Sequence, residues 1–103
     1  TAGATNLLVE TPALGKAIAQ SIGKSQIVLM RGHGATVVGP NVRLATFWAI
    51  YAEVNARQLA QAITIGGPIT FIGGEEQRLT HENMATAYER PWQMWKRDAM
   101  QQK

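Results

Sequence analysis

The sequence contains no cysteine, so disulfide bonds and thiolate metal sites are both excluded. No apolar run approaches the roughly 20 residues that a membrane-spanning helix needs. The first residues, TAGATNLLV, have neither the basic region nor the apolar region of a signal peptide, and the chain does not begin with methionine. These absences favour an ordinary folded domain and leave the redox compartment open.

The overall composition is that of such a domain. Of the 103 residues, 46% are apolar and 17% are charged. Folding at this size buries roughly 60–70% of the surface of the extended chain, which is enough for one modest core. No internal repeat, low-complexity segment or linker divides the sequence, and we therefore expect one unit.

The net charge is +3, and the basic residues are scattered except at the end of the chain. There, four of them lie among two tryptophans: Arg90, Lys96, Arg97 and Lys103 with Trp92 and Trp95. Such a pattern is compatible with single-stranded nucleic-acid binding. It is more typical of a helix with one packed aromatic face and one solvated charged face. We favour the helix and expect neither a nucleic-acid partner nor a membrane partner.

The most informative stretch is Ser25–Gly39, SQIVLMRGHGATVVG. The unbroken apolar run Ile27–Met30 predicts a strand that is buried on both faces. A second short run, Ala35–Val38, predicts another strand. The segment between them, Gly32-His33-Gly34, is too short for a loop, and glycine tolerates positive φ. We therefore expect two strands joined at a tight corner that carries one imidazole.

His33 has two interpretations at this corner. An imidazole between bare glycines on rigid strands can be approached closely by an ion or a substrate. Alternatively, the ring only caps the turn through a hydrogen bond. The remaining histidine, His81, lies in polar sequence and is expected at the surface. A catalytic zinc site takes three protein ligands, and the sequence contains no H-x-H or H-E-x-x-H pair to supply the others.

The flanking segments predict mixed helix and strand. Thr5–Glu10 is expected to be a short strand, followed by a helix that Thr11 caps, Pro12 begins and Gly23 ends. Leu14, Ile18 and Ile22 recur every four residues and share the buried face of this helix. Strand, helix and buried strand in this order indicate an α/β or α+β layer.

A long helix follows Gly39-Pro40, with Asn41 as its N-cap and Gly66-Gly67-Pro68 as its end. One face is a stripe of alanines suited to close packing on a sheet, and another is bulky: Ala45, Ala49, Ala52, Ala56 and Ala60 against Leu44, Phe47, Trp48 and Tyr51. Two apolar faces predict burial by the sheet and by another subunit. Glu53 is either a surface partner of Arg57 or a buried support for the site.

The last third of the chain is expected to be largely helical. Ile69–Ile72 predicts a short extended piece, and Gly73–Glu76 predicts a turn or the first residues of a helix. The paired glutamates there suit acid/base chemistry or, more simply, the helix dipole. Thr80 is expected to cap a helix that runs to Arg90. Pro91 then opens a final helix with Trp92, Trp95 and Ala99 on one face.

Three features together resemble the C-terminal half of the class II aldolase/adducin family. They are Leu29–Gly39 (LMRGHGATVVG), the helix Asn41–Ile65 with Glu53, Ala56 and Gln58, and the later Gly74-Glu75-Glu76. The resemblance implies an α/β fold, the three-layer α/β/α class II aldolase-like arrangement, of which residues 1–103 are the C-terminal part of one domain. We therefore expect the chain to begin within a longer protein.

The resemblance also implies a site. In that family the histidine of the corner is the third ligand of a catalytic divalent metal, and His33 occupies this place. The other two ligands come from an upstream H-x-H motif and the catalytic glutamate from earlier still, so the missing N-terminal half is an expected partner. In some members a tail tyrosine donates a proton, and Tyr88 is the tyrosine of this tail.

The implied activity is that of a lyase that cleaves C–C bonds. Retro-aldol cleavage or decarboxylation would proceed through a metal-stabilised enediolate, with zinc, manganese or another divalent cation. The expected substrate is a small hydroxy, keto or aromatic acid, and the expected assembly is a cytoplasmic homotetramer. In it, residues 88–103 are expected to pack across a subunit boundary and not to fold back on their own core. The alternative is a non-catalytic, adducin-like assembly module.

Overall fold

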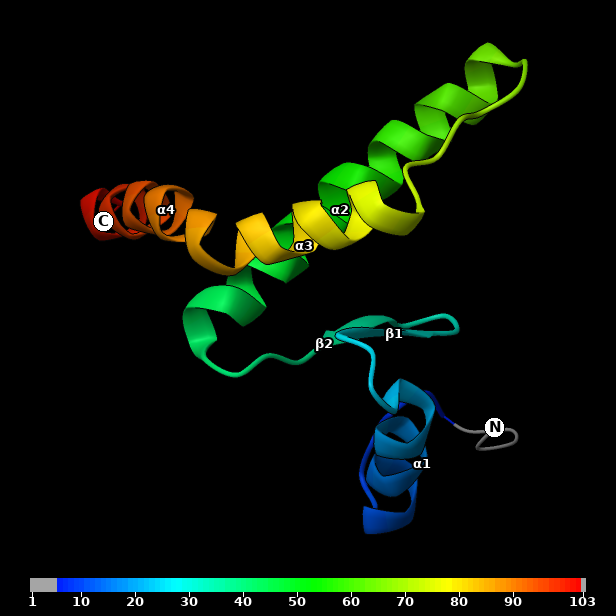
Figure 1. The fold of residues 1–103 in the computed structure, drawn as a ribbon. Coiled ribbons are helices and arrows are strands. Elements are labelled where there is room, and N and C mark those ends of the chain that lie inside the picture. The colour runs from blue at the N-terminus through cyan, green and yellow to red at the C-terminus, as the bar shows by residue number, and fades with distance from the viewer. Residues whose placement is uncertain (1–5, 103) are drawn as a thin grey trace. The chain divides into compact units, whose positions relative to one another are not determined.

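The structure is a computed structural model that describes residues 6–102. The elements follow the order α1 (Pro12–Ile22), β1 (Ile27–Met30), β2 (Gly34–Val37), α2 (Val42–Ile65), α3 (Gly74–Ala87) and α4 (Glu89–Gln101) (Figure 1). The chain divides after Gly39 into two compact units, and the assignment of residues 1–103 to one domain stays a prediction. No helix or strand continues across Gly39-Pro40, and each unit is described by itself.

The first unit contains α1, whose ends are those predicted. The Thr11 hydroxyl accepts a hydrogen bond from the Leu14 N–H at 3.3 Å, and Pro12 occupies the first helical position. Gly23 ends the helix with a φ of +52°, and its N–H donates to the Ala19 carbonyl at 3.2 Å. The helix packs against β1.

Strands β1 and β2 form an antiparallel hairpin in which Ile27 pairs with Val37 and Met30 with Gly34. This confirms two strands joined at a tight corner. The prediction that the first strand is buried on both faces is wrong, because Leu29 is 79% exposed. Side chains alternate between exposed and half-buried along β1, since the sheet of this unit has two strands and α1 is the helix that covers it.

The strand predicted over Thr5–Glu10 is also wrong for residues 6–10, and Thr5 lies outside the described residues. The Asn6 side-chain oxygen accepts a hydrogen bond from the Leu8 N–H at 3.1 Å, and Leu7 adopts a φ of +69°. A short polar side chain that bonds its own backbone in this way competes with strand pairing. The segment therefore turns instead of extending.

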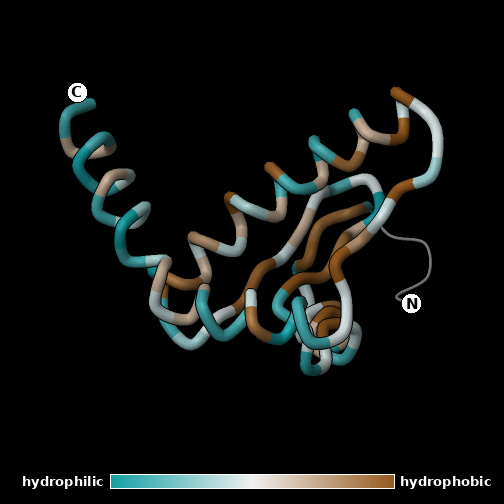
Figure 2. The backbone as a smooth tube through the Cα atoms, turned by 45° about the horizontal axis from the view of Figure 1, so that its top comes forward, coloured by the Kyte–Doolittle hydropathy of each residue, from teal (hydrophilic) through white to brown (hydrophobic). Residues whose placement is uncertain are grey.

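The second unit is organised by the long helix α2, which confirms the predicted bounds. The Asn41 side chain accepts from the Leu44 N–H at 2.9 Å, and Gly66, at a φ of +86°, ends the helix. Apolar and polar residues alternate along it (Figure 2). Leu44 and Phe47, at 8% and 5% exposure, are the buried hydrophobic residues of the described chain.

The alanine stripe of α2 has no sheet to pack on within its own unit, and its packing on a sheet stays a prediction. Ala56 and Ala60 are exposed, and the described part of this unit contains no strand. A sheet against the stripe would require strands that residues 40–102 do not supply. The alanine face of α2 is therefore suited to close packing but has no strand to pack against within this unit.

Helix α4 folds back on α2 through aromatic side chains. The Trp95 ring centroid lies 6.3 Å from that of Phe47 and 6.4 Å from that of Tyr51. The Arg43 guanidinium donates to both carboxylate oxygens of Glu89 at 3.1 Å. The prediction that the tail does not return to its own core is therefore wrong, because α2 offers an aromatic face within reach. Packing across a subunit boundary stays a prediction.

Helix α3 begins earlier than predicted. It starts at Gly74 with two glutamates in its first turn, so Thr80 lies inside the helix and does not cap one. The chain bends at Tyr88, and Pro91 lies in the first turn of α4, where a missing N–H disrupts no helical hydrogen bond. Residues 69–72 form no regular element.

The chain is thus helix-rich with a small antiparallel sheet of two strands in the described residues, and the three-layer α/β/α arrangement stays a prediction. Within the same range, every helix is too short or too polar to cross a bilayer.

Replacing Trp95 by alanine tests the docking of α4. Trp95→Ala removes a half-buried indole and both of its ring contacts, and we expect the free energy of unfolding of the C-terminal unit to fall by about 2 kcal/mol. Urea unfolding followed by circular dichroism measures this loss. The control is Trp92→Ala, since Trp92 is half-buried on the same helix but makes no ring contact with a described aromatic residue. Equal losses would contradict the assigned role of the stacked rings.

Glu89 makes the docking of α4 sensitive to acid. A hydrogen bond from Gln93, followed by those from Arg43, lowers the pKa of Glu89 below its ordinary value despite partial desolvation. The ionised carboxylate therefore stabilises the folded unit above the ordinary pKa, and this stabilisation is lost as pH falls through the lowered folded-state pKa.

We expect Glu89→Gln to destabilise the unit at neutral pH and to remove that part of its acid sensitivity. Urea unfolding of both proteins between neutral and acidic pH measures this. Glu53→Gln is the matched control, because its partner Arg57 lies on the same helix and does not join two helices. A parallel pH dependence of the wild-type chain and Glu89→Gln would contradict the expectation.

Candidate functional site

His33 lies in the turn of the β1–β2 hairpin, as predicted. The turn closes through a hydrogen bond from the His33 N–H to the Met30 carbonyl at 3.0 Å. Gly32 and Gly34 have φ values of +71° and +145°, which residues with side chains rarely adopt. Both glycines thus adopt the positive φ that the sequence analysis noted they tolerate.

The His33 side chain is exposed at this turn. It is His33's backbone N–H, and not its ring, that closes the turn, and no hydrogen bond or ion pair between described residues involves the ring. The interpretation of His33 as a turn-capping side chain therefore has no support in the structure. An exposed imidazole whose ring makes no hydrogen bond with a described residue is available to an external ligand.

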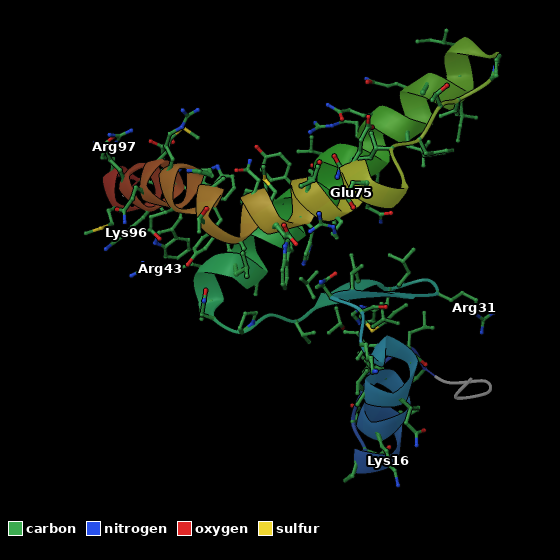
Figure 3. All side chains as sticks on the ribbon, viewed as in Figure 1. Lys16, Arg31, Arg43, Glu75, Lys96 and Arg97 are labelled. Carbon is green, nitrogen blue, oxygen red and sulfur yellow. The ribbon has the colours of Figure 1, made fainter. Side chains whose placement is uncertain are left out.

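Arg31 belongs to the same three-residue turn and is a feature that the sequence reasoning missed. Its side chain extends beyond the end of the hairpin (Figure 3). In residues 6–39 the single carboxylate is that of Glu10, which accepts a hydrogen bond from the Asn6 side chain at 3.4 Å. Arg31 forms no ion pair with a described residue. The sequence signal that Arg31 lacks an ion-pair partner was the scarcity of acidic residues in this stretch.

A divalent metal fits this turn through one ligand. A neutral imidazole is a suitable donor for zinc and similar cations, and His33 is unobstructed. Among residues 6–102, however, no group of three or more histidine, aspartate or glutamate side chains is close enough to hold a metal. The described chain can thus contribute one ligand, His33, to a metal site, but it does not complete such a site.

Tyr88 lies at the junction of α3 and α4 with helical backbone angles, and its side chain is half-buried. Its carbonyl accepts a hydrogen bond from the Trp92 N–H at 3.1 Å. Tyr88 belongs to the C-terminal unit and His33 to the N-terminal unit, so a site that contains both stays a prediction. His81 is exposed on α3, as the sequence indicated.

Glu75, one of the paired glutamates of α3, belongs to a surface ion cluster with Arg78 and Glu82. Arg78 donates to Glu75 and to Glu82, one helical turn away on either side. The hydrogen bond from Arg78 lowers the pKa of Glu75, which is the opposite of what a general acid at neutral pH needs. The helix-dipole interpretation is therefore the better one. The i, i+3 and i, i+4 spacing around Arg78 was a signal that the sequence reasoning overlooked.

Glu53 likewise proves to be a surface residue. Its carboxylate accepts a hydrogen bond from Arg57 at 3.3 Å, and both side chains are more than half exposed. The alternative role as a buried support for the site is wrong, because the helix face that carries Glu53 is open to solvent in its unit. Such an exposed pair contributes little to stability.

Comparison with known proteins identifies the class. Residues 2–60, which include the hairpin turn and most of α2, match the sequence model of the Class II Aldolase and Adducin N-terminal domain. The chain therefore belongs to the class II aldolase/adducin family. This confirms the resemblance seen in LMRGHGATVVG and the long helix.

One curated relative is the decarboxylase tropJ of Talaromyces stipitatus. It is 30% identical over 111 residues, which cover 90% of this chain and 42% of that protein. The chain thus spans about two fifths of the length of this relative. No solved structure matches the chain.

A comparison of Gly34, in the hairpin turn, with Gly15, inside α1, tests the backbone constraint at the turn. Gly34→Ala forces a side chain into a φ of +145°, and we expect the free energy of unfolding to fall by about 1–2 kcal/mol. Gly15→Ala is the matched control, because Gly15 lies inside α1 with nothing within 4 Å of the added methyl. There we expect a gain of about 1 kcal/mol in urea unfolding. A gain for both variants would contradict the constraint at the turn.

Proposed function

We propose that the chain is the C-terminal part of a divalent-metal-dependent lyase that cleaves C–C bonds by retro-aldol reaction or decarboxylation. The observation that carries the proposal is the exposed His33 ring, held between two glycines with positive φ on a hairpin turn. Membership of the class II aldolase/adducin family and the 30% identity to a protein named a decarboxylase support it.

In this proposal His33 supplies one ligand to the metal, and the rest of the protein supplies the others. When bound, zinc, manganese or a similar cation provides a Lewis acid that polarises substrate oxygens. The ring binds in its neutral form, so metal binding competes with protonation of His33. The two paired strands of the hairpin place the turn that carries His33, which a ligand on an unpaired loop would lack.

Arg31 suits the binding of an acidic substrate. A guanidinium pairs with a carboxylate through two parallel hydrogen bonds, and Arg31 is two residues from His33 without an internal carboxylate partner. Decarboxylation requires a substrate that carries a carboxylate. We therefore propose a small hydroxy, keto or aromatic acid as the substrate, with Arg31 as its contact.

Tyr88 is proposed as the proton donor of the reaction, with residues 88–103 reaching the site of a neighbouring subunit in a homotetramer. The half-buried phenol at the bend between α3 and α4 and its lack of a hydrogen bond with a described residue support this role. A subunit neighbour would also cover Met100, which is 75% exposed on α4.

An adducin-like assembly module is the second candidate. Large apolar side chains of the C-terminal unit are exposed, among them Ile65 at 86% and Phe71 at 70%. Exposed apolar surface of this kind is typical of an interaction surface. Metal analysis of the complete parent protein distinguishes the two functions, because the lyase retains about one divalent cation per chain and the module retains none.

Zinc titration of the isolated 103-residue chain tests the ligand role. Since one imidazole provides no chelation, we expect weak binding, seen by NMR as a shift of the His33 ring signals. His81→Ala should leave this binding unchanged, whereas His33→Ala should abolish it. Tight one-to-one binding, or binding that survives His33→Ala, would contradict the three-ligand account.

A further inference from the structure

The backbone around His33 is intrinsically soft, because glycine on both sides removes the steric limits that other residues impose. Gly32 is the third residue of a turn closed by the hydrogen bond from His33 to Met30, and its φ is +71°. A glycine at this position of a turn lets the chain reverse, but does not by itself hold the next side chain in one direction. A ligand needs a fixed direction, so some contact must restrain the turn.

Leu7 provides such a contact. A Cβ placed on Gly32 would lie 3.4 Å from Leu7 Cδ1 and 3.8 Å from Leu7 Cδ2. The branched end of the leucine therefore rests against the bare face of the glycine that precedes His33. The contact joins two segments of the N-terminal unit that are 25 residues apart in the sequence.

The backbone of Leu7 is itself unusual. Leu7 is the non-glycine residue of the described chain with a positive φ, at +69°. The hydrogen bond from the Leu8 N–H to the Asn6 side chain, at 3.1 Å, spans this residue and supports the conformation. Strained backbone of this kind persists where the surroundings require it and is concentrated near functional sites.

We propose that Leu7 is a positioning residue for His33. It acts through Gly32, whose open face it covers, and so fixes the turn that presents the imidazole. The role of the imidazole as a metal ligand rests on the proposed function, whereas the restraint on the turn does not. Asn6 completes the arrangement by holding Leu7 in the conformation that directs its side chain to the glycine.

Amide hydrogen exchange of the 103-residue chain tests this proposal, because the His33 N–H is the donor that closes the turn. Leu7→Asn keeps a residue that tolerates positive φ but removes the branched side chain. We expect the His33 amide to exchange about tenfold faster in this variant, as local opening becomes easier. The Val38 N–H, which donates to Gln26 at 2.9 Å at the other end of the hairpin, should keep its rate.

Leu8→Asn is the matched control, since Leu8 is 50% exposed and Leu7 is 44% exposed, and the exchange of the His33 amide should not change in it. Leu7→Met, which restores a long apolar side chain, should recover the slow exchange. The proposal is overturned if Leu7→Asn leaves His33 unaffected or if Leu8→Asn accelerates it equally. It is also overturned if Val38 accelerates together with His33, because the whole hairpin has then opened.

Zinc added to the same samples separates this inference from the proposed function. If zinc fails to shift the His33 ring signals in the wild-type chain, the metal role fails, and the exchange comparison still decides whether Leu7 holds the turn. If zinc shifts them, we expect a single set of ring signals in the wild-type chain and broadened signals in Leu7→Asn. Equally sharp signals in both would overturn the positioning of the ring.

Discussion

The backbone conformation of Gly32 and Gly34 is the constraint on which the candidate site depends. Positive φ on both sides of one residue turns the chain within three positions and leaves that residue at the tip. The short strands β1 and β2 follow from this turn, because their register is set by the pairing of Met30 with Gly34. The histidine is exposed for the same reason, since a hairpin turn projects from the sheet that it connects.

The C-terminal unit depends on a different interaction. Phe47 is buried where α4 contacts α2 and places Trp95 against the aromatic face. The Arg43–Glu89 pair lies at the start of both helices and fixes where the return begins. The remaining faces of α2 have no comparable cover within the unit, which explains why a helix with two apolar faces has one well-packed side.

Local signals were sufficient for the parts of the fold that short-range chemistry determines. Thr11, Asn41 and the glycine pair at 66–67 placed the ends of α1 and α2, because capping groups act within one helical turn. The same reasoning placed His33 at a corner, since glycine on both sides has few other uses. The resemblance to a metal-dependent family was likewise visible in the corner and the long helix.

What failed depended on contacts between distant residues. The burial predicted for Leu29 needs a covering layer on each face of the strand, which the sequence of the strand does not specify, and Leu29 is exposed. The strand predicted at 6–10 was lost to a hydrogen bond from the Leu8 N–H to the Asn6 side chain, whose competition with strand pairing the apolar pattern does not reveal. The contact between Leu7 and Gly32 could not be predicted from the sequence, because a contact between residues 25 positions apart leaves no helical or strand periodicity. The rest of the proposed site could not be derived either, because residues 6–102 contain no group of three or more side chains that could hold a metal ion.

The charge of the N-terminal unit has a consequence for the rate at which small molecules arrive. Residues 6–39 carry Lys16, Lys24 and Arg31 against one carboxylate, Glu10. A surface with an excess of one charge attracts oppositely charged molecules over a distance set by the Debye length, about 8 Å at physiological ionic strength. The excess of positive charge in this unit therefore favours the approach of anions, and added salt weakens that attraction without altering any contact in the folded chain.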